Sequence, residues 1–125
     1  MACSGQNAHQ GQVNYLAGLG AEDIVARNYE ERGLRILKTR FRGRRGEIDL
    51  IVQDGQTTVF VEVKQSRSHA SAALRVTQSK VQRLWATAEE YLARFSLSLM
   101  TDMRFYVALV DEQGRIEIHE NALMA

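Results

Sequence analysis

Two strand-like segments that flank the dipeptide Asp54-Gly55 constrain the fold of this chain more than any other feature. Residues 46–53 and 57–64 are together rich in isoleucine, valine, leucine and phenylalanine, and each is long enough for one β-strand. Aspartate and glycine both tolerate positive φ, which makes this dipeptide a strong signal for a tight turn. The two segments are therefore expected to form an antiparallel hairpin.

The rest of the chain alternates between helical and strand-like patterns. A helix is expected over 13–32, where Gly33 provides the stop. A second helix is expected over 78–95, because Thr77 can cap its first turn and apolar residues recur at helical spacing. Further strands are expected over 34–41, 104–110 and 115–119. The order helix, three strands, helix, two strands predicts an α/β domain whose central mixed sheet has about five strands flanked by helices.

The length of 125 residues fits one domain, with residues 1–12 as a flexible N-terminal tail and 13–125 as the domain. Cys3 is the only cysteine, so neither disulfides nor a cysteine–zinc cluster supports the fold. No apolar run approaches the ~20 residues needed to span a bilayer. The first twelve residues are polar and contain no signal-peptide core. We therefore expect a soluble, cytoplasmic protein with no membrane partner.

The hairpin gathers charged side chains on one face of the expected sheet. Because strand side chains alternate, Glu62 and Lys64 share a face, and so do Glu47 and Asp49 on the preceding strand. A two-residue turn at 54–55 makes Asp49 a diagonal neighbour of Glu62, whereas a four-residue turn places these carboxylates directly opposite. Either register puts all four side chains on one side, but a slip by one residue would separate them.

Three carboxylates and a lysine on one face indicate a site for a divalent cation. Like charges this close repel unless a cation neutralises them. Oxygen ligands without histidine or cysteine suit Mg²⁺ or Mn²⁺. Such an ion polarises a phosphate and activates a bound water, while a neighbouring lysine orients that water or stabilises transition-state charge, which is the chemistry of phosphodiester hydrolysis. The alternative is an exposed sheet face on which Glu62 pairs with Lys64 and Glu47 with an arginine.

Glu22 lies in the middle of the apolar face of the first expected helix. An ionised carboxylate on a buried stripe is costly unless it has a partner or a metal. Two interpretations stay open at this point. Either Glu22 belongs to the same site, or the helix end is half-buried and Glu22 reaches water.

The segment 35–45 contains six basic residues and no acidic one, namely Arg35, Lys38, Arg40, Arg42, Arg44 and Arg45. On a chain of net charge +1, such a strip can contact phosphates without making the whole surface basic. The alternative is that these charges protect an edge strand from pairing with other chains.

Asp49, followed across the hairpin by Glu62-Val63-Lys64, resembles the PD-(D/E)xK signature of restriction endonucleases and Holliday-junction resolvases. The wider pattern resembles the uncharacterised bacterial YraN-like proteins more closely. Its matching parts are the blocks 45–51 and 59–64, Ala21-Glu22, Gly33, Val76-Thr77-x-x-Lys80 and Arg104-Phe105. Three positions depart from the pattern: Ile48 replaces the signature proline, Ser66 an arginine and Tyr106 an acidic residue.

The resemblance implies a restriction-endonuclease-like fold with a metal site. Asp49, Glu62 and the backbone carbonyl of Val63 would then bind Mg²⁺ or Mn²⁺, Lys64 would be the catalytic lysine, and Glu22 would complete the catalytic set. The resemblance also puts Lys80 near the site or on an edge that faces nucleic acid. With the basic strip, the expected nucleic-acid contacts are Arg40, Arg42, Arg44, Arg45, Arg67 and Lys80.

The expected function is metal-dependent hydrolysis of phosphodiester bonds in DNA, including branched or structured DNA. A homodimer is compatible with this function, because resolvases cut two strands as dimers. Two alternatives stay open. One is a nucleic-acid-binding module of the same fold that does not cut, and the other is a protein-interaction domain.

Overall fold

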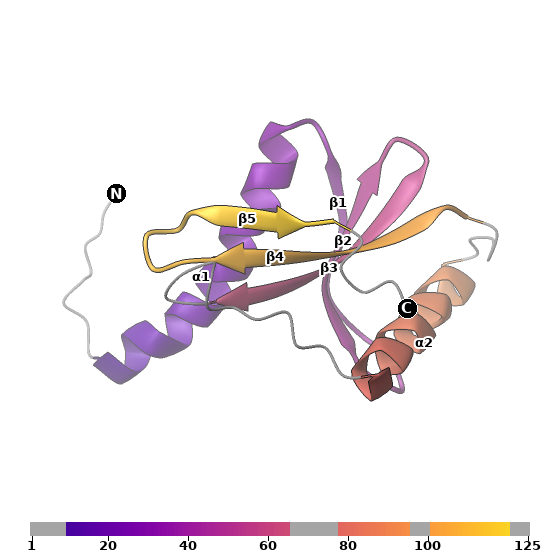
Figure 1. Ribbon diagram of the computed structural model, residues 1–125, viewed down its shortest axis with the longest axis horizontal. Coiled ribbons are helices and arrows are strands. Elements are labelled where there is room, and N and C mark those ends of the chain that lie inside the picture. The colour runs from indigo at the N-terminus through magenta and orange to yellow at the C-terminus, as the bar shows by residue number, and fades with distance from the viewer. Residues whose placement is uncertain (1–9, 66–77, 96–100, 121–125) are drawn as a thin grey trace.

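The computed structural model describes residues 10–65, 78–95 and 101–120 (Figure 1). Two helices and five strands make up this part of the chain. In chain order they are α1 (Gln10–Glu31), β1 (Arg35–Arg42), β2 (Glu47–Asp54), β3 (Thr57–Gln65), α2 (Gln78–Arg94), β4 (Met103–Val110) and β5 (Ile116–His119). This order is the predicted one. The start of α1 was predicted wrongly, because the helix includes residues 10–12, which were expected in the tail.

The strands form one mixed sheet in the order β1-β2-β3-β4-β5. β3 and β4 are parallel, and the other neighbouring strands are antiparallel. Parallel neighbours need a crossover connection, and α2 lies in the connection between β3 and β4. The predicted α/β class with a central mixed sheet is confirmed. Neither of the helices that the structure describes is both long and apolar enough to cross a membrane.

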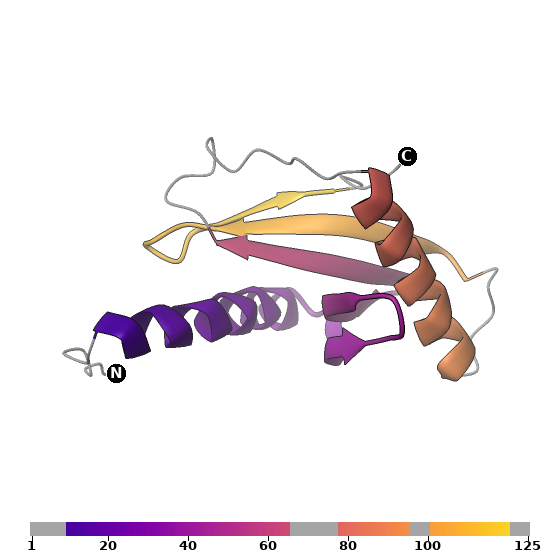
Figure 2. The same cartoon turned by 90° about the horizontal axis from the view of Figure 1, so that it is seen from below.

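The sheet separates two apolar clusters, because successive residues of a strand point to opposite faces. One cluster contains Phe60 and Phe105 together with Tyr91 of α2. The other contains Val59 and Val61 together with α1 residues such as Val25. The two helices therefore cover opposite faces of the sheet. In both views the first turns of α1 and the whole of α2 lie toward opposite ends of the molecule (Figures 1 and 2).

The turn between β2 and β3 selects one of the two expected registers. Asp54 pairs with Thr57, so that Gly55 and Gln56 form the turn. Gly55 has a φ of 63°, a left-handed conformation that glycine adopts without steric cost. The register that paired Gln53 with Gln56 is therefore wrong. The register that sets Asp49 opposite Glu62 is the one that forms.

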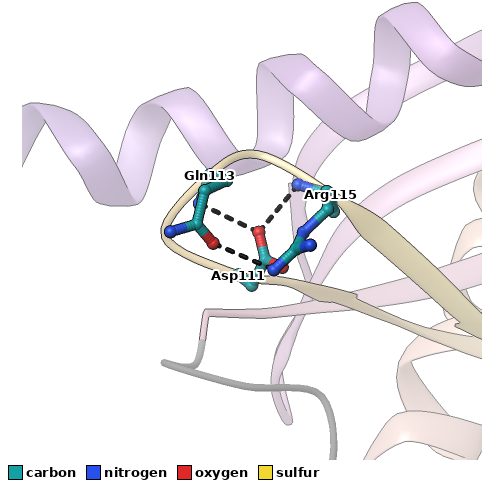
Figure 3. A network of polar contacts seen from close by, with 3 residues as sticks. All are labelled: Asp111, Gln113 and Arg115. Carbon is teal, nitrogen blue, oxygen red and sulfur yellow. Dashed lines mark hydrogen bonds and ion pairs between the residues drawn. The ribbon is translucent and has the colours of Figure 1, made fainter.

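Asp111 organises the turn between β4 and β5 (Figure 3). One oxygen of its buried carboxylate accepts hydrogen bonds from the backbone N–H groups of Gln113 and Arg115, at 2.9 and 2.8 Å. Its other oxygen accepts a hydrogen bond from Arg115 Nε at 2.6 Å. Burial raises the pKa of Asp111, but the hydrogen bonds with Arg115 and Gln113 outweigh burial and hold the pKa below its ordinary value.

We expect Asp111→Ala to lower the thermal midpoint more than Asp111→Asn, because the asparagine oxygen can still accept from both backbone N–H groups. The depressed pKa sets the sign of the pH dependence. The stabilisation is present above the unfolded pKa of about 3.9 and is lost as the pH falls through the folded pKa. Thermal unfolding of the wild type and both variants at pH 7 and pH 3 is the measurement. Equal midpoints for the two variants would show that the network does not stabilise the turn.

Candidate functional site

The register of β2 and β3 brings Asp49 opposite Glu62. Leu50 pairs with Val61, and the same register carried one position further aligns the two acidic residues. Asp49 Oδ2 accepts a hydrogen bond from the backbone N–H of Val63 at 2.8 Å. The two residues predicted to bind metal therefore directly follow the last pair of the β2–β3 ladder, and the charge of Glu62 acts on the Asp49 carboxylate, which is hydrogen-bonded to the Val63 backbone.

The strands β1 and β2 change faces beside Asp49 instead of alternating regularly. Leu50 belongs to the cluster under α1, whereas Ile48, two residues earlier, belongs to the cluster under α2. On β1, Phe41 pairs with Ile48 and joins the same cluster. Arg40, just before Phe41, has a φ of 54°, which is uncommon for a residue with a side chain. The regular alternation that was expected to give Glu47 and Asp49 a common face is thus interrupted between Ile48 and Leu50.

Glu22 approaches the aligned carboxylates from α1. Its charge is one of those that raise the pKa of Asp49. Its side chain is 22% exposed, and its Oε1 accepts a hydrogen bond from Arg40 Nε at 2.9 Å. Both residues line a surface cleft of about 210 Å³. Glu22 is therefore half-buried, has a basic partner, and acts electrostatically on Asp49.

Two lysines share one oxygen of Glu62. Lys80 Nζ of α2 lies 2.6 Å from Glu62 Oε2, and Lys64 Nζ lies 3.5 Å from the same atom. The Glu62 side chain is only 14% exposed, so salt screens these pairs less than it screens surface pairs. Of the two locations that the resemblance allowed for Lys80, the structure gives the one beside the carboxylates.

Asp49 has the strongest electrostatic perturbation at this site. Burial raises its pKa, the hydrogen bond from Val63 opposes that rise, and the charges of Glu62, Glu22 and Glu47 raise it further. The resulting pKa is about 6, against an ordinary value of 3.8. A carboxylate whose pKa is raised in this way lies in a region of negative potential, where a bound cation would be stabilised. Groups with strongly shifted pKa values cluster at functional sites.

The donor set fits a hydrated Mg²⁺ or Mn²⁺ ion better than a closed metal cage. Within the part of the chain that the structure describes, no three histidine, cysteine, aspartate or glutamate side chains converge as a metal-binding group. Mg²⁺ is commonly held by one or two carboxylates and keeps several of its waters. Asp49 and Glu62, whose charges act on one another, match this smaller requirement in number and in type of ligand.

Comparison with known sequences identifies the family of the chain. The model of the uncharacterised protein family UPF0102 matches residues 21–110, a range that includes every acidic and basic residue described at the carboxylate site. The chain belongs to the UPF0102 family. The predicted membership of the YraN-like proteins is thereby confirmed.

Relatives within UPF0102 match over almost their whole length. The UPF0102 protein of Ruegeria pomeroyi is 52% identical over 115 residues, which cover 92% of this chain and 94% of the relative. A UPF0102 protein of Cereibacter sphaeroides is 49% identical over 115 residues, covering 92% of this chain and 98% of the relative. That of Roseobacter denitrificans is also 49% identical over 115 residues, covering 92% and 89%.

In this UPF0102 chain the turn between β1 and β2 packs tightly against α2. The backbone N–H of Arg44 donates a hydrogen bond to Glu90 Oε1 at 2.8 Å. A Cβ on Gly43 would lie 2.5 Å from that oxygen, so any larger residue would have to displace the Glu90 carboxylate from this hydrogen bond. Arg44 and Arg45 are exposed on the turn, which is thereby held at a fixed place on the helix. A surface hollow of about 610 Å³ beside the turn contains neither aligned carboxylate.

Of the six predicted nucleic-acid contacts of this UPF0102 chain, the five that the structure describes do not form one surface strip. Arg40 and Lys80 lie at the carboxylates, and Arg42 lies 3.7 Å from Glu47 Oε2. The other predicted contacts are Arg44 and Arg45 on the turn and Arg67 outside the described residues. Sequence patterns did not indicate the role of Glu90, because it lies beside the apolar stripe of α2 and has no motif of its own.

Proposed function

We propose that this UPF0102 protein is a divalent-metal-dependent nuclease that hydrolyses phosphodiester bonds in DNA, including branched DNA. The observation that carries the proposal is the electrostatic proximity of Asp49 and Glu62 at the end of the β2–β3 ladder, with Lys64 beside the same glutamate. Grouped, partly buried charges of this kind contribute nothing to apolar packing. Burial first, and the charges of the neighbouring glutamates after it, raise the pKa of Asp49 to about 6, a cost that a binding site explains.

Each residue of the site has a distinct role in this proposal. Asp49 and Glu62 would hold Mg²⁺ or Mn²⁺, an ion that supplies Lewis-acid polarisation of the phosphate and a more acidic bound water. Glu22, on α1, adds negative charge near Asp49. Lys64 puts a positive charge near the reacting phosphate, where transition-state charge develops. Arg44 and Arg45 contact backbone phosphates from the rigid turn.

The test is a calorimetric Mn²⁺ titration of the wild type beside Asp49→Ala and Glu62→Ala. Asp54→Ala is the matched control, because Asp54 lies on the same strand as Asp49 but is exposed at the turn. The same samples are incubated with linear and four-way-junction DNA, with chelator in parallel. We expect metal binding and cleavage in the wild type and the control, and loss of both in the two site variants.

Two results would contradict the proposal. The absence of Mn²⁺ binding in the wild type would remove the metal site. Cleavage that persists undiminished in Asp49→Ala would show that any nuclease activity arises elsewhere on the chain or from a contaminant.

A second candidate is a module that binds nucleic acid without cutting it. It is favoured by one observation, which is that Glu22 and Glu62 are both held by basic side chains. DNA binding that survives Asp49→Ala and weakens steeply with salt, without cleavage in the wild type, would select this candidate.

A further inference from the structure

The two glutamates at the site are held by the side chains that the sequence assigned to nucleic acid. Arg40 Nε lies 2.9 Å from Glu22 Oε1, and Lys80 Nζ lies 2.6 Å from Glu62 Oε2. Arg40 lies on β1 and Lys80 on α2, so the two glutamates are held by cations from different elements of the fold. The same two cations therefore have two kinds of anionic partner, a carboxylate within the chain and a phosphate outside it.

The backbone at Arg40 supports a specific placement of its side chain. A φ of 54° is unfavourable for an L-residue with a Cβ, and residues held in this region cluster at functional sites. Arg40 is the only non-glycine residue with positive φ among the residues that the structure describes. Its conformation coincides with the change of faces between Thr39 and Phe41 and accompanies the contact with Glu22.

The ion pair with Lys80 occupies Oε2 of Glu62, one of the two oxygens of a carboxylate that would bind the metal in the proposed reaction. Lys80 and Lys64 both approach Oε2, and Glu62 is largely shielded from solvent. An ammonium at 2.6 Å neutralises the charge that would attract a divalent cation to that oxygen. Full metal binding at Glu62 thus requires that Lys80 weaken its contact.

We infer that Arg40 and Lys80 are exchangeable counterions, which hold Glu22 and Glu62 in the free chain and transfer to DNA phosphates when substrate binds. They are positioning residues, because they act on the reaction through the two glutamates. The exchange couples phosphate binding to metal binding, and such coupling acts equally in both directions. This inference rests on the proposed function, but its main test needs no metal and no cleavage.

The first experiment measures binding of a short DNA duplex by fluorescence anisotropy in EDTA. Glu62→Gln should bind about tenfold more tightly than wild type, within the usual range of coupling between sites, because the charge of Glu62 then no longer competes with phosphate for Lys80. In a Lys80→Met background the same substitution should bring a much smaller gain, since only Lys64, which lies 3.5 Å from Glu62 Oε2, is then released. The same double-mutant cycle is measured for the other ion pair, with Glu22→Gln alone and in an Arg40→Met background.

Glu89→Gln is the control for the lost charge, because Glu89 is exposed on α2. A gain for Glu62→Gln that equals the gain for Glu89→Gln, or that is undiminished in the Lys80→Met background, would overturn the inference. So would a wild type that binds no duplex.

The second experiment is the Mn²⁺ titration of Lys80→Met, Lys80→Arg and wild type without DNA. Lys80→Met should bind Mn²⁺ about tenfold more tightly, and Lys80→Arg should return the affinity to the wild-type value because it keeps the charge. Weaker Mn²⁺ binding in Lys80→Met would overturn the inference. If no sample binds Mn²⁺, the proposed nuclease reaction fails, and the EDTA cycle still decides the exchange of partners.

Discussion

Replacing Asp49 with asparagine is expected to make the fold more stable at pH 8, although it removes a residue of the proposed site. The pKa of Asp49 rises from 3.8 to about 6 in the folded chain, mainly through burial. A shift of about two units corresponds to ~3 kcal/mol of cost to the folded state once the carboxylate is ionised. Asparagine has no such charge and can still accept the hydrogen bond from Val63.

The sign of the pH dependence follows from the raised pKa. The folded state holds the Asp49 proton more tightly than the unfolded state does, so the associated stabilisation is fully present below pH 4. It is lost as the pH rises through about 6. Relative to Asp49→Asn, the wild type should therefore be most stable at pH 4 and less stable at pH 8, and the difference between their free energies of unfolding should change by up to ~3 kcal/mol between these pH values.

Urea unfolding in chelator at several pH values measures this difference. Chelator is required because a bound cation would offset the repulsion that the prediction depends on. Asp54→Asn is the matched control, since the exposed Asp54 sits at the turn and should follow the wild type at every pH. If the free energies of unfolding of the wild type and Asp49→Asn changed in parallel with pH, the pKa of Asp49 would not be raised by folding.

Replacing Lys64 with methionine should lower DNA cleavage on the order of 10²–10³-fold, the usual effect of removing a group that stabilises transition-state charge. Metal binding should persist in this variant, because both carboxylates, Asp49 and Glu62, are unchanged. Arginine should not restore the rate, since a planar guanidinium does not replace a compact ammonium. Single-turnover cleavage with saturating Mn²⁺ is the measurement.

Lys38→Met is the control for Lys64→Met, because Lys38 is an exposed lysine on β1 and its loss removes the same charge. Equal rates in the two variants would leave Lys64 without a part in the reaction. If Lys64→Met lost Mn²⁺ binding as well, Lys64 would instead act by positioning Glu62, from which it lies 3.5 Å.

Local patterns were enough to predict the sheet and the alignment of the site. The alternation of Val59, Phe60 and Val61 between two clusters follows directly from strand geometry. Asp54-Gly55 predicted the hairpin, and both registers considered kept Asp49 and Glu62 together because they differ by an even number of positions. The error in the turn therefore did not affect the predicted pairing of the carboxylates.

Other features depended on tertiary contacts that no local pattern encodes. The positive φ of Arg40 is unfavourable by local preference, so a reading of the sequence has no reason to expect it. The partners of Glu22 and Glu62 come from β1 and α2, and only the packing of both elements on the sheet brings Arg40 and Lys80 to them. The contact between Glu90 and the turn at Arg44 likewise joins segments that share no motif.

The contacts at the site join residues that are close in sequence, whereas the contact between the first residues of the parallel strands β3 and β4 closes a much longer loop. The hydrogen bonds from Val63 to Asp49 and from Arg40 to Glu22 join residues 14 and 18 positions apart, whereas Thr57 and Asp102 at the start of β3 and β4 are 45 apart. Loop-closure entropy rises by only ~0.6 kcal/mol for each doubling of loop length. The longer loop therefore costs only about 1 kcal/mol more chain entropy than the shorter ones, which is less than the ~3 kcal/mol cost of ionising Asp49. A bound cation would offset the larger of these two costs.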